Sequence, residues 1–376
     1  MGKERILEQL FTNRAIFEIF FVFFPIFKVL KIFRFSDDFI NLMVLPLVAL
    51  FFGTGNRTPF VSSAVVARVF LDPDLRLFDY DPDCMISEQP QMFVFPKLGE
   101  IYQVIPKAIQ GKVFLNRPAQ KVERKGKKIK VTDDQGKSEV FDYLIFACDP
   151  ETILKITKGL TWLERKLLGN VKYFDDVTVA HTDEDYMKKY YDIDMKNRDL
   201  HFVKTDEKDP KKIDISFNLT FYQPQLKDKK PYVFQTIFLN KEDQDKWTKN
   251  EIKKGKIQLE KWWRQMSHAW THFAKWIPCQ RFIQGTKSTF YARSYTWVNT
   301  HEIATISGLA AAARIEAPYP FGYDKLAKKQ FNGYSFVVHG KILTKGTASM
   351  LLTLCNVLFV IVGLYIGFKV LHALLK

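Results

Sequence analysis

The chain has 376 residues, of which 47% are hydrophobic, and a formal net charge of +15. This length holds two modest domains and the apolar fraction is enough for a folded core, so a disordered chain is excluded. Lysine-rich loops carry much of the charge, which is typical of solvated surface or of attraction to anionic lipid. No recognition module or aromatic platform accompanies the lysines, so nucleic acid is not an expected partner.

The amino-terminal 35 residues are rich in aromatic side chains. Segment 16–27 is too short to span a bilayer and is interrupted at Pro25, with basic residues behind it. Two interpretations stay open: a helix lying in the membrane interface, or a core helix pair that belongs with substrate-domain helices over 36–110. Glu4 and Glu8 precede the apolar run, so a cleavable signal peptide is not expected.

Residues 47–58 imitate a nucleotide-binding turn, because an apolar run enters Gly53-Thr-Gly55-Asn-Arg-Thr58. A helix-like stretch at 60–70 and a candidate strand at 75–81 follow. However, Thr58 stands where a third glycine would allow close helix–strand packing, and Pro59 opens a very short helix. We therefore predict a structured loop between two elements.

Hydrophobic patterns predict strands through the middle of the chain. The run 141–148 is continuously apolar apart from Asp142, as in a sheet covered on both faces, and it stops at Asp149-Pro150. An aromatic helix is expected at 261–272. Further strands are expected at 113–116, 120–124, 128–132, 216–221 and 232–240.

Neither the histidines nor the cysteines form a metal-binding pattern. His268 and His272 have the i, i+4 spacing of two ligands on one helical face, but no third ligand stands nearby, so hydrogen-bonded histidines are favoured. His181 and Asp183 are more typical of a strand-end cap than of an acid–base pair. The cysteines lack the spacing of a disulfide framework or a zinc site; they are Cys84, Cys148, Cys279 and Cys355.

The most specific motif runs from Tyr291 to Arg314 and continues through Ala317-Pro-Tyr-Pro-Phe321. Its small residues at 306–313 let a helix lie very close to its neighbour, as backbone does around phosphates and flavin rings. The motif resembles the second flavin-contacting motif of the flavin-dependent amine oxidase superfamily. Similar segments at 141–147, 179–183, 216–220 and 283–285 extend the resemblance over about two thirds of the chain.

This resemblance implies an α/β (α+β) fold in which an incomplete FAD-binding domain accompanies a mixed α/β substrate-like domain. It assigns 111–160 to a remnant of the FAD-domain sheet, 161–282 to the substrate-like domain, and 283–340 to the flavin-contact motif and its helix. It also implies that the following residues lie at the cofactor: Val122, Ser294, Tyr295, Thr296, His301, Glu302, Ile303, Ser307 and Gly308.

Two departures weaken the expectation of flavin binding. No strand–G-x-G-x-x-G–helix opening precedes the matched region, although the FAD pyrophosphate needs such a turn. Arg293 stands where relatives have glycine, so its side chain would take cofactor space, swing outward or pair with a phosphate. FAD is therefore expected only if a partner chain supplies the missing half. The absence of a general base decides little, because the flavin carries the hard step.

The carboxyl-terminal residues 348–368 contain no charged side chain and are close to the length that crosses hydrocarbon. We predict a single transmembrane anchor over 346–376, in which Asn356 faces another helix. Lysines are more frequent on its amino-terminal side, which favours a cytosolic or matrix location for the folded part.

Two functional hypotheses follow. In the first, the chain is a degenerate, non-catalytic amine-oxidase-like accessory subunit of a larger membrane complex, with contacts to lipid and to other subunits. In the second, it is the carboxyl-terminal half of an FAD-dependent oxidoreductase whose glycine-rich half is another polypeptide. The mitochondrial inner membrane is favoured over the endoplasmic reticulum.

Overall fold

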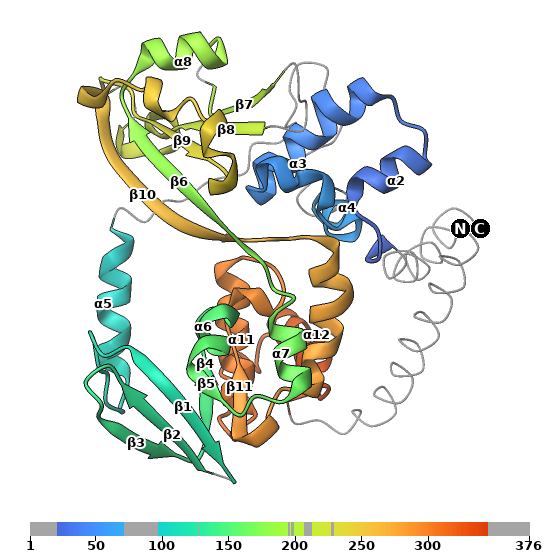
Figure 1. Cartoon of the computed structure of the whole chain (residues 1–376), viewed down its shortest axis with the longest axis vertical. Coiled ribbons are helices and arrows are strands. Elements are labelled where there is room, and N and C mark those ends of the chain that lie inside the picture. The colour runs from blue at the N-terminus through green and yellow to red at the C-terminus, as the bar shows by residue number, and fades with distance from the viewer. Residues whose placement is uncertain are drawn as a thin grey trace. The chain divides into compact units, whose positions relative to one another are not determined.

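The computed structural model describes residues 21–70 and 97–344, except for 127, 195, 197, 198, 207–212, 227 and 228. These residues form two compact units, and each unit combines segments that are distant in the sequence (Figure 1). Unit 1 contains 21–24, 115–172 and 268–344, whereas unit 2 contains 25–114 and 173–267.

Unit 1 contains a small parallel sheet in which β4 (Leu144–Phe146) pairs with β11 (Thr289–Tyr291). A second sheet has the order β3-β2-β1-β5, with β1 to β3 as an antiparallel meander and β5 parallel to β1. Its strands are β1 (Ala119–Lys125), β2 (Lys128–Asp133), β3 (Ser138–Phe141) and β5 (Thr157–Lys158).

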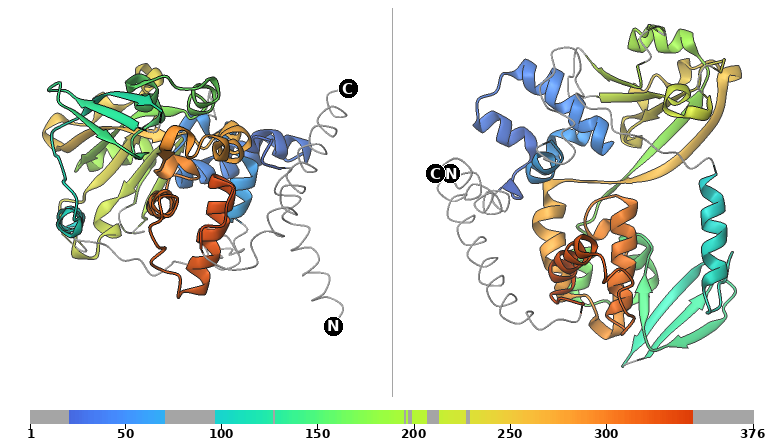
Figure 2. Two further views of the ribbon diagram at one scale, coloured as in Figure 1. Left: turned by 90° about the horizontal axis from the view of Figure 1, so that it is seen from below. Right: turned by 180° about the vertical axis from the view of Figure 1, so that it is seen from behind.

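Helices cover both faces of the parallel pair. On one face, Ile145 and Phe290 pack with Ala311 of α11 (His301–Ala313), where small residues permit close approach. On the other face, Phe146 stacks on Tyr291, whose hydroxyl reaches Glu164 of α7 (Trp162–Leu168). Two further helices of this unit are α6 (Pro150–Ile156) and α12 (Lys325–His339), and α12 packs against α11 (Figure 2).

A continuous helical segment from residue 270 to residue 282 also belongs to unit 1. It contains a π-helical turn, η7 (His272–Trp276), then α10 (Ile277–Cys279) and the 3-10 turn η8 (Gln280–Phe282). The chain then reverses at Gly285, whose φ of 90° favours glycine, into the 3-10 turn η9 (Thr286–Ser288).

Unit 2 is built on an antiparallel sheet of order β10-β6-β9-β8-β7. Its strands are β6 (Tyr173–His181), β7 (His201–Thr205), β8 (Ile213–Asn218), β9 (Phe234–Phe238) and β10 (Ile257–Met266). Its helices are α2 (Ile26–Ile32), η1 (Phe39–Val44), α3 (Leu45–Phe52), η2 (Gly55–Phe60), α4 (Ser63–Phe70), α5 (Leu98–Ala108), α8 (Glu184–Tyr191), α9 (Leu219–Tyr222), η3 (Pro224–Leu226), η4 (Lys241–Lys246), η5 (Lys249–Glu251) and η6 (Lys254–Lys256).

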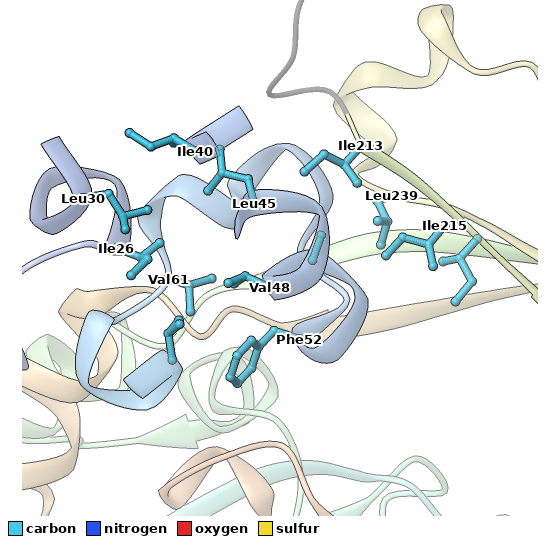
Figure 3. Packing of buried hydrophobic residues seen from close by; sticks show 13 residues of the cluster. Ile26, Leu30, Ile40, Leu45, Val48, Phe52, Val61, Ile213, Ile215 and Leu239 are labelled. Atoms are coloured by element: carbon cyan, nitrogen blue, oxygen red, sulfur yellow. The ribbon is translucent and has the colours of Figure 1, made fainter. Parts of the chain in front are cut away.

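The core of unit 2 joins the amino-terminal helices to the sheet. Ile26 and Leu30 of α2 and Val48 of α3 lie in one cluster with Ile213 and Ile215 of β8 (Figure 3). Removing these side chains from water stabilises the fold by about 1.5–3 kcal/mol each. Of the predicted amino-terminal segment, residues 22–24 form a turn, Pro25 forms a β-bridge with Ser62, and residues 26–27 begin the core helix α2. Residues 16–20 lie outside the described residues.

In the pattern at 47–58, the glycine-containing part 53–58 is a structured loop, as predicted, whereas 47–52 belong to α3. The loop follows α3, which is a helix and not a strand, and Gly53 ends that helix in the left-handed conformation with φ of 58°. Residues 55–60 then form the 3-10 turn η2, which leads into α4. The candidate strand at 75–81 lies outside the described residues.

Two strand predictions are confirmed, at 120–124 and 128–132, and the predicted strand at 232–240 forms over 234–238. The predicted strand at 113–116 is wrong, because these residues have no regular structure. The runs 141–148 and 216–221 are strands only in part, over 144–146 and up to Asn218, which caps α9.

The predicted helix at 261–272 is wrong over 261–266, because residues 257–266 form β10 and pair with β6 along almost the whole strand; only 270–272 are helical. Trp262 contacts Trp247, whereas Trp263 packs against the core around α3, so neighbouring side chains face opposite ways. This two-residue period is that of a strand.

Within the described ranges, none of the helices is both long enough and apolar enough to cross a membrane. The predicted anchor at 346–376 lies outside those ranges.

Candidate functional site

The candidate site lies where the parallel strands β4 and β11 end, since open α/β sheets bind ligands at the carboxyl ends of their strands. β4 continues through Cys148 and Asp149 into α6, with Asp149 at the N-cap. β11 continues through Ala292 to Arg293, and the Ala292 N–H donates to the Phe146 carbonyl at 2.8 Å, which extends the pairing. The two turns therefore lie side by side.

Arg293 links these turns. Its guanidinium Nη1 lies 2.8 Å from Asp149 Oδ1, and its backbone N–H donates to Ser307 Oγ of α11 at 2.7 Å. The side chain thus pairs within the chain and is 42% exposed, as an outward orientation predicts, and the phosphate contact stays a prediction. Its backbone, at φ of 123° and ψ of 170°, occupies a region that is almost exclusive to glycine.

Cys148 lies beside this ion pair. Burial raises the pKa of its thiol, so the thiol is the neutral form near neutral pH and is a poor nucleophile. The site as described thus offers an ion pair and a thiol, and it does not offer an activated nucleophile.

Behind the site, one stripe of side chains holds the backbone that follows β11. The side chains are spaced four residues apart along the segment that contains the 270–282 helix: His268, His272, Trp276, Gln280 and Gln284. Each makes a hydrogen bond to the backbone of segment 291–299. This spacing places them on one face of the helical segment.

The stripe contacts successive backbone groups. Trp276 Nε1–H donates to the Tyr295 carbonyl at 2.9 Å, and the Gln280 amide donates to the Thr296 carbonyl at 2.7 Å. The Gln284 amide donates to the Tyr291 carbonyl at 2.9 Å and accepts the Tyr291 N–H at 3.0 Å. The loop is therefore fixed from behind, as a binding loop on a rigid support would be.

The two histidines complete this stripe. His272 Nε2 lies 3.0 Å from the Trp297 carbonyl, to which it donates, and His268 Nε2 accepts the Asn299 N–H at 3.2 Å. Burial lowers the pKa of His272 to about 4 and that of His268 to about 3, so both rings are neutral at neutral pH. Their i, i+4 spacing was visible in the sequence, and following it to Gln284 would have found the whole stripe.

The predicted cofactor residues fall into three groups. Tyr295 and Thr296 are buried in η10 (Ser294–Thr296), and the Tyr334 hydroxyl donates to Thr296 Oγ1 at 2.7 Å. His301 and Glu302 are exposed on the first turn of α11, next to Ile303, whose N–H is capped by Thr300.

The other predicted residues lie farther along their elements. Ser307 is buried and holds the Arg293 N–H, and Gly308 follows it with no atom within 4 Å of an added Cβ. Val122 is buried in β1, opposite Val131 and beside Thr157, in a different sheet from β4 and β11. The structure thus gathers the residues of α11 and η10, and places Val122 in another sheet.

A buried ionic network lies under the parallel pair and was not predicted. Arg124 donates to both carboxylate oxygens of Glu164 at 2.6 and 2.9 Å, and the Tyr291 hydroxyl donates to Glu164 at 2.8 Å. Although burial opposes ionisation, the bonds from Arg124, Thr161 and Tyr291 lower the pKa of Glu164 to about 2. This network fixes β11 to α7.

In unit 2, a strand-end cap was predicted for His181 and Asp183; His181 ends β6, but Asp183 caps a helix. His181 is buried and hydrogen-bonds Thr236 at 2.9 Å, and burial lowers the pKa of its ring to about 4. Asp183 caps α8 by accepting the Tyr186 N–H.

Across the residues that the structure describes, no group of three or more histidine, cysteine or carboxylate side chains is arranged so that it could hold a metal ion.

The described turns after β4 and β11 do not fit a dinucleotide. They contain no glycine, and the Asp149 carboxylate and the Arg293 guanidinium pair across them at 2.8 Å. A carboxylate also repels phosphate. The chain's own residues therefore do not form a cofactor cradle at this edge.

The fold of this chain is similar to that of solved FAD-dependent flavoproteins of the amine oxidase superfamily, which agrees with the resemblance in the sequence. Cyclohexylamine oxidase from Brevibacterium oxydans IH-35A matches with a TM-score of 0.50 and 12% identity, over 83% of this chain and 76% of that one. No protein-family model matches the sequence. No curated protein matches it either.

Other solved structures match over smaller shares. A fatty acid isomerase from P. acnes that produces CLA gives a TM-score of 0.43 and 15% identity over 58% of this chain. Putrescine oxidase bound to putrescine gives 0.45 and 11% over 72% of this chain. The chain spans 52% of the isomerase and 64% of that oxidase.

Proposed function

We propose that this chain is a non-catalytic, amine-oxidase-like subunit of a larger membrane assembly. The observation that carries the proposal is the ion pair of Arg293 with Asp149 at the carboxyl ends of β4 and β11. In open α/β sheets this edge is the ligand-binding edge. Here both turns are joined to each other, and the side chain responsible stands in a backbone conformation that favours glycine.

The backbone of Arg293 makes this ion pair informative. A non-glycine residue in such a region costs about 1–3 kcal/mol, and strain of this kind persists where the surrounding structure imposes it. Ser307 and Asp149 hold Arg293 from two sides, at 2.7 and 2.8 Å. We interpret this as a fold that is retained for its surfaces after its ligand edge has been closed.

The membrane part of the proposal rests on the sequence. Residues 348–368 carry no charge and are close to the span length of a bilayer. We propose that they anchor the chain in the mitochondrial inner membrane, in preference to the endoplasmic reticulum. Extraction at alkaline pH tests this: the full chain should stay with the membrane, whereas a chain ending at Thr344 should be released.

A second candidate function is the carboxyl-terminal half of a split FAD-dependent oxidoreductase. The stripe from His268 to Gln284 favours it, because five side chains fix the backbone of 291–299 as a binding loop requires. In that case a companion chain supplies the glycine-rich half, and the exposed turn of α11 at His301 and Glu302 contacts the cofactor. The flavin would supply the redox chemistry, on an apolar substrate reached from the membrane.

The absorbance spectrum of the native assembly, purified in mild detergent, separates the two candidates. We expect no flavin bands between roughly 350 and 500 nm, and none after Arg293→Lys, which retains a cation. Flavin bands that co-purify with a glycine-rich companion would establish the split enzyme and overturn the non-catalytic proposal.

A further inference from the structure

The two outer edges of the parallel pair β4–β11 in unit 1 differ in whether their backbone groups are hydrogen-bonded. The outer edge of β11 is closed by groups of the same chain. The Gly285 N–H donates to the Thr289 carbonyl at 2.8 Å, and the Gln284 side-chain amide satisfies both the N–H and the carbonyl of Tyr291. Gln284 thus takes the place of a neighbouring strand, and the sheet ends there.

The outer edge of β4 has no such closure. Because the Phe146 carbonyl accepts the Ala292 N–H, the backbone groups of Phe146 point toward β11. Alternation along a strand then directs the N–H and carbonyl of Ile145 and Ala147 away from β11. Among the described residues, no hydrogen bond is formed by these outward backbone groups.

Side-chain burial shows the same asymmetry. All three residues of β11 are buried, whereas Leu144 and Ile145 of β4 are only half-buried. Tyr143, just before β4, is 54% exposed, and Ala147, just after it, is also exposed. Strands of a parallel sheet that helices cover on both faces are normally buried, so an apolar strand with this exposure lacks a neighbour.

We propose that the open edge of β4 binds a parallel β-strand of a companion polypeptide. The N–H and carbonyl groups of Ile145 and Ala147 form the ladder, and Tyr143 packs on the added strand. The existing pair is parallel and is covered by α11 on one face and α7 on the other. A parallel strand continues that arrangement, and backbone hydrogen bonds at an exposed edge are a general mode of recognition.

Symmetry explains why the occupant is not a second copy. A two-fold axis presents the same patch on both subunits, so two β4 edges that meet across it run antiparallel. A parallel neighbour must therefore be a different segment. This inference goes beyond the proposed function, because it holds whether or not the companion carries a flavin.

Residue-resolved hydrogen exchange on the native assembly tests the ladder. The amides of Ile145 and Ala147 should be protected in the assembly and at least 100-fold less protected in the purified chain. The Phe146 amide, which faces β11, should be protected in both. Equal exchange of Ile145 and Ala147 in the two samples would overturn the proposal, whereas a side-chain contact alone would not produce the alternation.

Photo-crosslinking identifies the occupant and its direction. A benzoylphenylalanine at position 143 and another at position 147 should label one apolar segment of one companion chain, with the contact of 147 carboxyl-terminal to that of 143. The reverse order would exclude a parallel strand. Labelling of a second copy, or of residues 1–20 or 71–96 of the same chain, would exclude the companion.

The control is the same photo-reactive residue at Tyr323, which is 83% exposed in unit 1 and far from β4 in the sequence. It should not label the segment reached from 143 and 147. The outcome is independent of the absorbance test, because strand addition can be confirmed in an assembly with or without flavin bands.

Discussion

At the scale of single residues, Arg293 is a residue whose type does not suit its backbone conformation. At most sites glycine is less stable than alanine by about 0.5–1 kcal/mol, because it loses more backbone freedom on folding. At φ of 123° and ψ of 170°, glycine should instead be more stable than alanine. We expect Arg293→Gly to be more stable than Arg293→Ala by about 1 kcal/mol, since both lose the ion pair and only glycine relieves the strain.

Urea unfolding of the two variants measures this difference. The matched pair Arg165→Gly and Arg165→Ala, on the exposed face of α7, should show the usual order, with glycine less stable by about 1 kcal/mol. The same order at both positions would show that Arg293 is unstrained.

Glu164 gives the second prediction at this scale. Glu164→Gln leaves the Arg124 guanidinium buried without its counter-charge, and loss of one partner of a buried pair costs about 3–5 kcal/mol. The native pKa of about 2 lies below the ordinary value of 4.5. The stabilisation is therefore complete above pH 4.5 and is lost as the pH falls from 4.5 toward 2.

Urea unfolding at several pH values should show this dependence in the native chain and its absence in Glu164→Gln. Asp142→Asn is the control, because Asp142 pairs with Lys128 at 2.6 Å on the surface. Such pairs contribute about 0–1 kcal/mol. A loss in Glu164→Gln as small as that of the control would mean that the buried network does not hold β11 to α7.

At the scale of elements, the stripe from His268 to Gln284 supports the loop after β11. Gln284→Leu leaves the buried N–H and carbonyl of Tyr291 without partners, and each unsatisfied group costs about 1–3 kcal/mol. We expect a loss of at least about 2 kcal/mol in urea unfolding. Gln330→Leu, on an exposed position of α12, should change stability by no more than about 0.5 kcal/mol. Equal effects of the two changes would contradict the supporting role.

The elements also show what sequence patterns can and cannot give. Residues 120–124 and 128–132 alternate clearly and were predicted as strands, since local pattern and final environment agree. Residues 261–266 carry two adjacent tryptophans that fit either a helix or a strand, and pairing with β6 decides between them. The closeness of Arg293 to Asp149 depends on two strands that are far apart in the sequence, so no local pattern contains it.

At the scale of the whole molecule, the two units should differ in acid stability. In unit 1, burial lowers the pKa of His268 and His339 to about 3 and that of His272 to about 4. In unit 2, the lowered pKa values of His181 and His201 are partly offset by Asp176, whose pKa burial raises to about 6.

The sign follows from proton binding. Below pH 6.5 the unfolded chain protonates histidines that the folded chain keeps neutral. The free energy of unfolding therefore decreases as the pH decreases, by about 1.4 kcal/mol per pH unit for each histidine. Three histidines give unit 1 a slope of about 4 kcal/mol per pH unit. Asp176 acts oppositely, because the folded state binds its proton first and gains stability as the pH falls from 6 to 3.8. Unit 1 should therefore open first as the pH falls from 6.5 toward 4.

Hydrogen exchange of peptides from α11 and α12, compared with peptides from β6 and β9, measures which unit opens first. His339→Leu should reduce the slope of unit 1's unfolding free energy against pH by about 1.4 kcal/mol per pH unit, the share of one histidine. Both ring nitrogens of His339 lack a hydrogen-bond partner in the described structure, so the change removes no hydrogen bond there. The exposed His301 changed to Gln should leave the slope unaltered. If unit 2 opened first, or if His339→Leu kept the full slope, buried neutral histidines would not be the source of acid lability. Their placement behind the 291–299 loop would then be a matter of hydrogen-bond geometry alone.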